Sequence, residues 1–137
     1  MLIVVNLISF LYMIKLSYAE SLAFKKMGFK EKTDGYFVVK VPIDVCCPDN
    51  WNNKGEGFVA MLNVYQAVEF LSAKKGIYIS ISVHTNHEMR KAELMTTVTY
   101  TRIGYITCQN EIGNRYTTIE TALYAGVKNV LETLNKL

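Results

Sequence analysis

Apolar and polar side chains alternate strictly along Ile77-Tyr78-Ile79-Ser80-Ile81-Ser82-Val83-His84. This period of two is typical of a β-strand with one buried face. We expect the four branched aliphatic residues of the stretch to face helices. The opposite face of the strand then stays uncovered, and it consists of Tyr78, Ser80, Ser82 and His84.

A second β-rich stretch follows this strand in the sequence. Leu94 to Cys108 is rich in Thr, Val, Ile and Tyr, which favour extended backbone. The stretch predicts either one long strand or a hairpin bent at Arg102-Ile103-Gly104, and both alternatives stay open. We expect a polar loop over residues 85–93 to join it to the alternating strand.

The sequence before residue 63 predicts one strand and a long loop. Tyr36 to Val41 has the composition of a strand, preceded by a turn at Thr33-Asp34-Gly35 and ended by Pro42. Residues 43–57 contain a proline, three asparagines and two glycines, so we expect a loop there. A short extended piece follows at residues 58–62.

Three capping boxes mark the starts of helices. In this motif a Ser, Thr or Asn side chain accepts a hydrogen bond from the third helical amide, and a Glu or Gln side chain reaches back. The three pairs are Ser17 with Glu20, Asn63 with Gln66, and Thr117 with Glu120. Glycine then ends the first two helices, at Gly28 with Phe29 folding back and at Gly76, while the third helix continues to the C-terminus.

The order of these elements is helix, strand, helix, strand, one or two further strands, helix (α-β-α-β-β(-β)-α). Short connections favour antiparallel neighbours. We therefore expect an α+β fold with a single antiparallel sheet of three to four strands and about three helices packed on one face. Residues 1–15 are expected to be an apolar N-terminal segment, and residues 16–137 a single α+β domain.

The apolar N-terminal segment allows several interpretations. Ser17-Tyr18-Ala19 has the small-x-small form of a signal-peptidase site, but no Lys or Arg precedes the apolar run. If residues 1–19 are a signal peptide, the protein is exported, and a membrane contact follows only if residues 1–15 are an anchor. Alternatively translation starts at Met13. We prefer a capped helix at Ser17 and a cytoplasmic protein of a bacterial host, because the following helix, Gly28 and Phe29 all agree with it.

Charge and cysteine content restrict the function classes. The 137 residues carry 15 basic and 12 acidic side chains, a net charge of +3, which is small for a dedicated nucleic-acid binder. Three cysteines are too few for a disulfide framework. Cys46-Cys47 with His84 and His87 lacks the spacing of zinc ligands. No nucleophile elbow or phosphate loop is present, so we expect no enzyme, cofactor or metal.

Three segments of the chain are similar to a family of small uncharacterised proteins from phages and prophages of Bacteroidetes bacteria. The segments run from Leu16 to Phe29, from Val64 to Ile79 and from Tyr116 to Lys128. Phe70-Leu71 stands where the family commonly has Trp-Leu or Trp-Phe, and Thr118 and Thr121 stand where it has acidic residues. The resemblance implies an N-terminus near Met13 and a phage or prophage origin, and it implies no chemistry.

Protein–protein binding is the function that these observations favour. An uncovered sheet face suits a protein partner or a second copy of the chain, and its expected residues are Tyr78, Ser80, His84, Tyr100 and Tyr105.

Nucleic-acid binding is the alternative. The helix–strands–helix portion from Val64 to Leu137 resembles the double-stranded RNA-binding domain, with an α-β-β-β-α order. Phosphate contacts would then come from Lys25, Lys26, Lys30 and Lys32. Against this alternative, residues 116–121 contain no Lys where that domain carries a Lys-rich helix start.

Overall fold

The structure is a computed structural model, and it describes residues 13–88 and 90–136 apart from the side chain of Cys46. Its elements, in chain order, are α2 (Tyr18–Lys26), β1 (Thr33–Val38), β2 (Val41–Asp49), the 3-10 helix η1 (Trp51–Asn53), β3 (Phe58–Met61), α3 (Val64–Lys75), β4 (Ile77–Asn86), β5 (Lys91–Arg102), β6 (Tyr105–Tyr116) and α4 (Ile119–Thr133).

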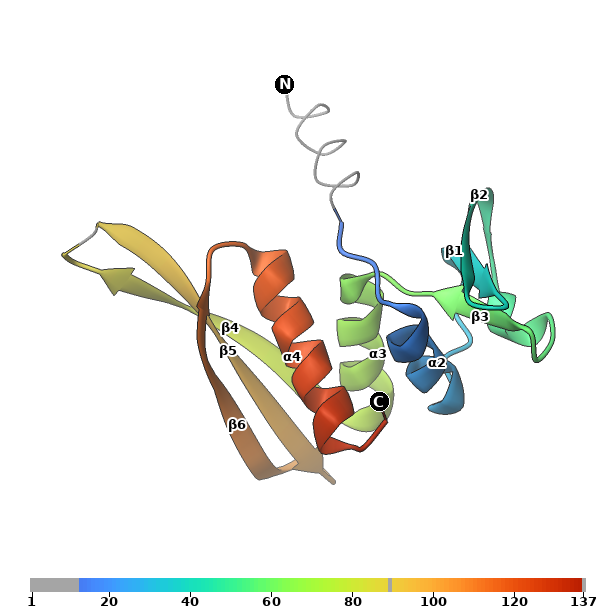
Figure 1. The fold of residues 1–137 in the computed structure, drawn as a ribbon. Helices are drawn as coiled ribbons and strands as arrows, with labels where there is room; N and C mark the ends of the chain where they lie inside the picture. Colours follow the sequence, from blue (N-terminus) through green and yellow to red (C-terminus); the bar gives the residue numbers. More distant parts are fainter. Residues whose placement is uncertain (1–12, 89, 137) are drawn as a thin grey trace.

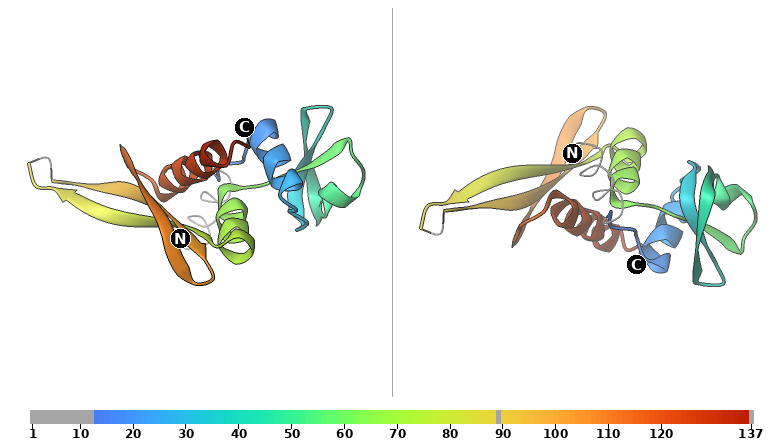
Figure 2. Two further views of the ribbon diagram at one scale, coloured as in Figure 1. Left: turned by 90° about the horizontal axis from the view of Figure 1, so that it is seen from below. Right: turned by 90° about the horizontal axis from the view of Figure 1, so that it is seen from above.

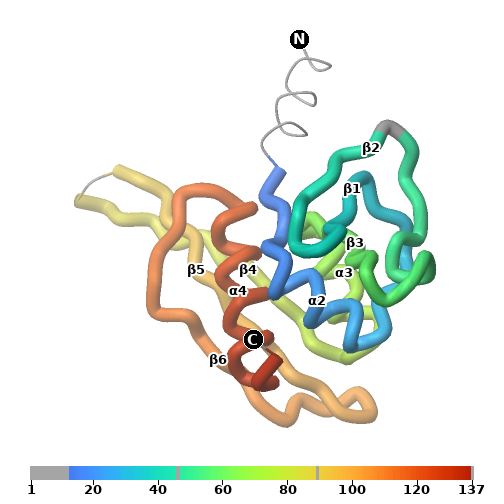
Figure 3. The backbone as a smooth tube through the Cα atoms, turned by 45° about the vertical axis from the view of Figure 1, so that its right-hand side comes forward, coloured from blue at the N-terminus to red at the C-terminus, as the bar shows by residue number. Residues whose placement is uncertain are grey.

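The strands form two antiparallel sheets. The first sheet has the order β2-β1-β3, and the larger sheet, whose strands are longer, has the order β4-β5-β6. The mixed α+β class is therefore confirmed, but the expected single sheet and the expected element order are wrong. Figure 1 and Figure 3 show the helices between the two sheets. Helices α3 and α4 pack on β4–β6, whereas α2 packs on β3. Two of the three expected helices thus cover one face of the larger sheet.

The first sheet was predicted in part. The expected extended piece at residues 58–62 is β3, whereas the expected strand from Tyr36 to Val41 is divided between β1 and β2 by a turn of unusual sequence. Val39 and Lys40 both adopt positive φ, at 49° and 65°, and join β1 to β2. Pro42 does not end a strand: it pairs with Phe37 as part of the edge strand β2. Proline is tolerated on an edge because its missing amide can face away from the sheet. The expected turn at residues 33–35 is the start of β1, and much of the expected loop 43–57 is β2.

Two of the three capping boxes are present as expected. The Glu20 amide donates to Ser17 Oγ and the Gln66 amide to Asn63 Oδ1, and in both boxes the return hydrogen bond is made. The third box is wrong by one residue, because the amide of Thr121 donates to the Thr118 hydroxyl and the helix begins at Ile119.

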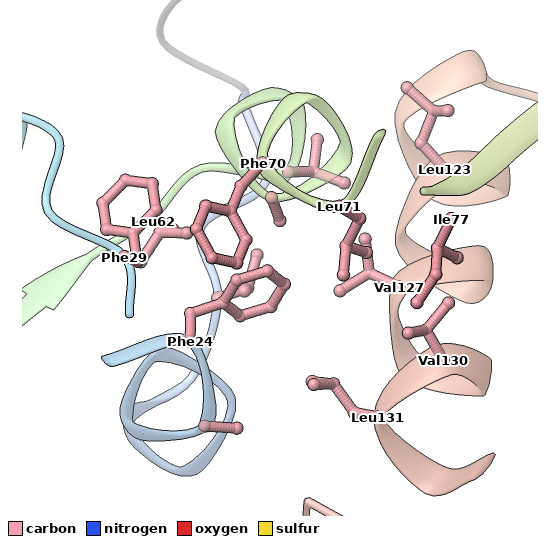
Figure 4. Close-up of a cluster of buried hydrophobic side chains, with 14 of the residues drawn as sticks. Phe24, Phe29, Leu62, Phe70, Leu71, Ile77, Leu123, Val127, Val130 and Leu131 are labelled. Carbon is pink, nitrogen blue, oxygen red and sulfur yellow. The ribbon is translucent and has the colours of Figure 1, made fainter. Parts of the chain in front are cut away.

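Gly28 ends α2 as the sequence predicts. It has a φ of +99°, and the Phe29 amide donates to the Phe24 carbonyl at 3.0 Å while the Gly28 amide donates to that of Lys25. These two bonds are a Schellman motif. The reversal buries the Phe29 ring against the Phe70 ring, and Phe24 also meets the Phe70 ring edge-on (Figure 4).

One hydrophobic core runs from α2 to the larger sheet. Phe24, Phe29 and Phe70 lie at one end, and Leu71, Val127 and Val130 continue it to Ile77 (Figure 4). Val98 of β5 belongs to the same core. A smaller cluster of Phe37, Val59 and Met61 lies within the first sheet, against Tyr18 and Leu22. The larger core therefore includes side chains from all three helices.

The larger sheet matches the expectations in part. The segment from Leu94 to Cys108 is a hairpin, with its turn at Ile103-Gly104. The expected polar loop is shorter than predicted, because β4 continues to Asn86 and β5 begins at Lys91. Ile77 is buried and Ile79 and Ile81 pack on the core, as predicted. Val83, however, is 68% exposed, because the β4–β5 hairpin extends beyond the helices (Figure 1).

No helix among residues 13–88 and 90–136 combines the length and the apolar character needed to cross a membrane.

Candidate binding surface

The larger sheet has one face that the described helices leave open. Helices α3 and α4 both pack on its other face (Figure 2). Directly opposed residues of antiparallel strands point to the same face, so the register assigns residues to the open face. Tyr78 is paired with Thr99, and Thr99 with Gln109. We call this surface of β4–β6 the open face.

Three of the five predicted binding residues lie on the open face. Tyr78 is 49% exposed, and Ser80 and His84 follow it at the expected alternate positions of β4. Ser82 lies between the latter two on the same face, and its Oγ is 3.1 Å from Nε2 of His84. The open face of β4 is therefore a row of hydroxyl, phenol and imidazole groups with no Asp, Glu, Lys or Arg side chain among them.

Tyr100 does not belong to this surface. It is paired with Ile77, so it points to the helix-covered face, and its ring packs against the core. Its hydroxyl is buried without a hydrogen-bond partner among the described residues. The expectation that Tyr100 adds to the open face is therefore corrected by the register, which sequence alone did not supply.

Tyr105 lies at the β5–β6 turn, where three large apolar side chains are exposed together. Ile103 is 88% exposed, Tyr105 77% and Ile106 64%. Ile106 is paired with Thr101, two residues along β5 from Thr99, so it shares the open face with Tyr78. Tyr105 is paired with Arg102, so it points to the opposite face, and the expectation that it adds to the open face is corrected. We call Tyr78, Ile103, Tyr105 and Ile106 the apolar end of the sheet.

Ile103 also occupies a strained backbone conformation. Its φ is +53°, a left-handed value that is unfavourable for a β-branched residue, and Gly104 follows at +78°. Two-residue turns of this kind normally contain Asn-Gly or Asp-Gly. Ile103 and Ile106 were missed as site residues, and the sequence signal that could have found them is an Ile-Gly pair at a hairpin turn.

The four lysines proposed as phosphate contacts do not act as one group. The Nζ of Lys25 donates to the carbonyls of Gly55 and Phe58, so it holds the loop before β3. The other three, Lys26, Lys30 and Lys32, are exposed. Lys30 lines a shallow groove of about 460 Å³ with Lys74, Lys75 and Glu31, and Lys32 lines another of about 140 Å³ with Glu31 and Glu69. Acidic side chains are thus interspersed with these lysines.

A larger groove of about 630 Å³ lies between β6 and α4. Arg115 and Lys128 line it together with Tyr124. The Tyr124 hydroxyl donates to the buried Glu20 carboxylate at 2.8 Å. Burial of the phenol, which is the larger cause, and this hydrogen bond together raise the pKa of Tyr124 to about 12. Lys128 lies 5.3 Å from the centre of the Tyr124 ring. The phenol therefore stays protonated and ties α4 to α2.

The cysteines and histidines do not converge. Cys47 and Cys108 are exposed free thiols, and His84 and His87 are exposed on and beside β4. Within the part of the chain that the structure describes, no group of three His, Cys, Asp or Glu side chains could hold a metal ion.

Comparison with known proteins gives no relative: no protein-family model, no curated protein and no solved structure matches the chain. The function is therefore inferred from the surface residues themselves.

Proposed function

We propose that this protein is a non-enzymatic module that binds another protein through the open face and the apolar end of the larger sheet. The observation that carries the proposal is the exposure of Tyr78 and Ile106 on the open face, with Ile103 and Tyr105 exposed at the adjoining β5–β6 turn. Exposed apolar side chains gathered in one place, with polar groups around them, mark protein interaction sites.

The strain at Ile103 supports the same proposal. A left-handed, β-branched residue costs about 1–2 kcal/mol relative to a residue suited to the turn. Nothing within the described fold repays that cost, because the side chain is almost fully exposed. Strained residues that persist in this way cluster at functional sites.

The polar residues beside the apolar end suit recognition rather than catalysis. Tyr, Ser and Thr side chains offer hydrogen bonds with little loss of side-chain entropy when a partner binds. On the open face, Ser80 and Ser82 lie along β4 from Tyr78, and Thr97 and Thr99 lie on β5. The resemblance to phage and prophage proteins supports an accessory role, for which we propose a location in the bacterial cytoplasm.

Nucleic-acid binding is the second candidate. The order of α3, three antiparallel strands and α4 is that of the double-stranded RNA-binding domain, and this favours it. Two observations favour the protein partner instead. Residues 77–116 carry four basic and three acidic side chains, so the sheet lacks the positive excess that phosphates need. The start of α4 carries Glu120 and no lysine.

Photo-crosslinking tests the proposal. We would replace Ile106 with a benzophenone amino acid in the full chain, and Glu132 on α4 as the matched exposed control. We expect a light-dependent crosslink between this chain and its partner protein from position 106. The crosslink should be absent from position 132, and it should be lost when Ile103→Lys is added. Nuclease treatment should leave the size of this crosslinked product unchanged. A nuclease-sensitive product would instead favour the second candidate, and equal products from both positions would contradict a specific surface.

A further inference from the structure

The edge strands of the two sheets differ in how they are protected. An unpaired strand edge offers amides and carbonyls to other chains, and proteins protect it with charges, prolines, bulges or short length. Strand β2 contains Pro42, Pro48 and a register shift, and β3 has four residues. Strand β6 has two register shifts and also carries Glu111 and Arg115. Three of the four edges in the described sheets are thus protected.

Strand β4 has none of these features. Its ten residues include no proline and no Asp, Glu, Lys or Arg. Its register with β5 is unbroken from Ile77, opposite Tyr100, to Asn86, opposite Lys91. Among the described residues, no strand pairs with its other side. A long, regular and uncharged edge of this kind is expected to bind another strand.

We infer that the outer edge of β4, over Ile77–Thr85, pairs antiparallel with β4 of a second copy of this chain. The inference goes beyond the proposed function, because it uses the edge of the sheet rather than its open face. A two-fold axis perpendicular to the sheet relates the copies and gives one six-stranded sheet with both helical layers on the same side. Such an axis closes the assembly as a dimer.

The register of this pairing follows from the sequence of β4. The two-fold axis pairs odd positions with odd positions, so the aliphatic residues of both copies share the helix-covered face. With Ile81 at the axis, Ile79 lies opposite Val83 of the second copy. The exposed Val83, which no described helix covers, then gains an aliphatic neighbour. This pairing explains an apolar side chain on the helix side that the single chain leaves in solvent.

We call the line along which the two β4 strands pair the seam, and its polar face is also self-complementary. Tyr78 lies opposite His84 of the second copy, and Ser80 lies opposite Ser82. No like-charged Asp, Glu, Lys or Arg side chains meet, because β4 contains none of these residues. Peptide ligands that add to a sheet edge use adjacent pockets for specificity. The three grooves described above contain no residue of β4, which favours a second copy as the occupant.

Sedimentation of charge variants tests the inference. The full-length protein should sediment at micromolar concentration as a dimer of the 15.6 kDa chain. Ser80→Lys with Ser82→Lys places Lys opposite Lys twice across the seam, and should weaken association at least about tenfold. Ser80→Lys with Ser82→Glu places Lys opposite Glu twice, and should restore the dimer. Both serines are exposed, so the fold of each variant is checked by its circular dichroism and melting temperature.

Thr107→Lys with Gln109→Lys is the matched control. It adds the same two charges to the exposed surface of β6, the opposite edge, and should leave the dimer intact. A wild-type protein that stays monomeric at tens of micromolar would overturn the inference. So would a Lys/Lys variant that dimerises like the wild type, or a Lys/Glu variant that fails to recover. None of these outcomes depends on crosslinking at Ile106, so the inference and the proposed function fail separately.

Discussion

Tyr124 and Glu20 form a hydrogen-bonded pair that joins the last helix to the first described one. Glu20 is buried, its carboxylate accepts from the Ser17 amide, and Tyr124 donates to both of its oxygens at 2.8 and 2.9 Å. A buried carboxylate that loses a donor keeps its desolvation cost without the compensating bond. The pair therefore links a helix cap, which is a local feature, to contact between helices far apart in the sequence.

Tyr124→Phe should lower the free energy of unfolding by about 1–3 kcal/mol near neutral pH. The pKa of Tyr124 is raised from 10.0 to about 12, so between these values the phenol is ionised in the unfolded chain and protonated in the folded one. Rising pH then favours unfolding, and the advantage of the wild type should be full below pH 10 and lost by about pH 12. Urea unfolding of both proteins at pH 8 and about pH 11 measures this.

Tyr65→Phe is the control for that experiment. Its hydroxyl also donates to a carboxylate at 2.8 Å, but both Tyr65 and that contact with Glu120 are exposed. The expected loss near neutral pH is therefore smaller, below about 1 kcal/mol. Equal losses for the two variants would mean that burial of Glu20 contributes nothing.

Ile103→Asn should stabilise the protein by about 1 kcal/mol, against the usual direction of substitutions. Asn tolerates the positive φ at this position of the β5–β6 turn better than a β-branched residue does. Ile106→Asn is the control, because Ile106 is similarly exposed but has no positive φ. Thermal unfolding of both variants measures the difference, and a destabilised Ile103→Asn would show that the Ile side chain is needed by the fold.

Helix starts and ends could be predicted from the sequence wherever the signal is local. The capping boxes at Ser17 and Asn63 and the glycines at 28 and 76 each act within a few residues, and all four have the expected role. The predicted start of α4 was wrong by one residue, because Thr117 and Thr118 are chemically equivalent candidates for the N-cap. Glu120 at the right spacing favoured Thr117, whereas the backbone enters the helix after Thr118.

Thr118→Ala should therefore cost about 1 kcal/mol of stability, and Thr117→Ala much less. The Thr118 hydroxyl accepts from the Thr121 amide at 3.2 Å and lies 2.6 Å from the Thr121 hydroxyl, so its loss leaves a helix amide without its cap. Chemical denaturation of the two single variants compares them directly. The reverse order of stabilities would place the cap at Thr117.

At the scale of the whole molecule, the features that sequence could not supply are those that depend on pairing. The composition of β5 predicted a strand, but only the register shows that Tyr100 lies with Ile77 on the covered face. The β1–β2 hairpin of the first sheet was missed because Val39-Lys40 lacks the usual turn residues and Pro42 normally ends a strand. Both errors arise where tertiary structure overrides a local preference.

The two sheets should nevertheless unfold together, because one core joins all three helices to the larger sheet. Trp51, the one tryptophan in the chain, lies beside the first sheet, with its ring stacked on Tyr36 at 4.1 Å. Its fluorescence therefore reports the first sheet, whereas far-ultraviolet circular dichroism reports the whole protein. We expect coincident urea transitions by the two probes.

Leu71→Ala, at the buried centre of α3, should lower the stability measured by both probes by about 2–5 kcal/mol. Val83→Ala on the exposed hairpin should have little effect at monomer concentrations. A Trp51 transition that precedes the dichroism, or one that Leu71→Ala leaves unmoved, would show that the first sheet is stabilised independently of the shared core.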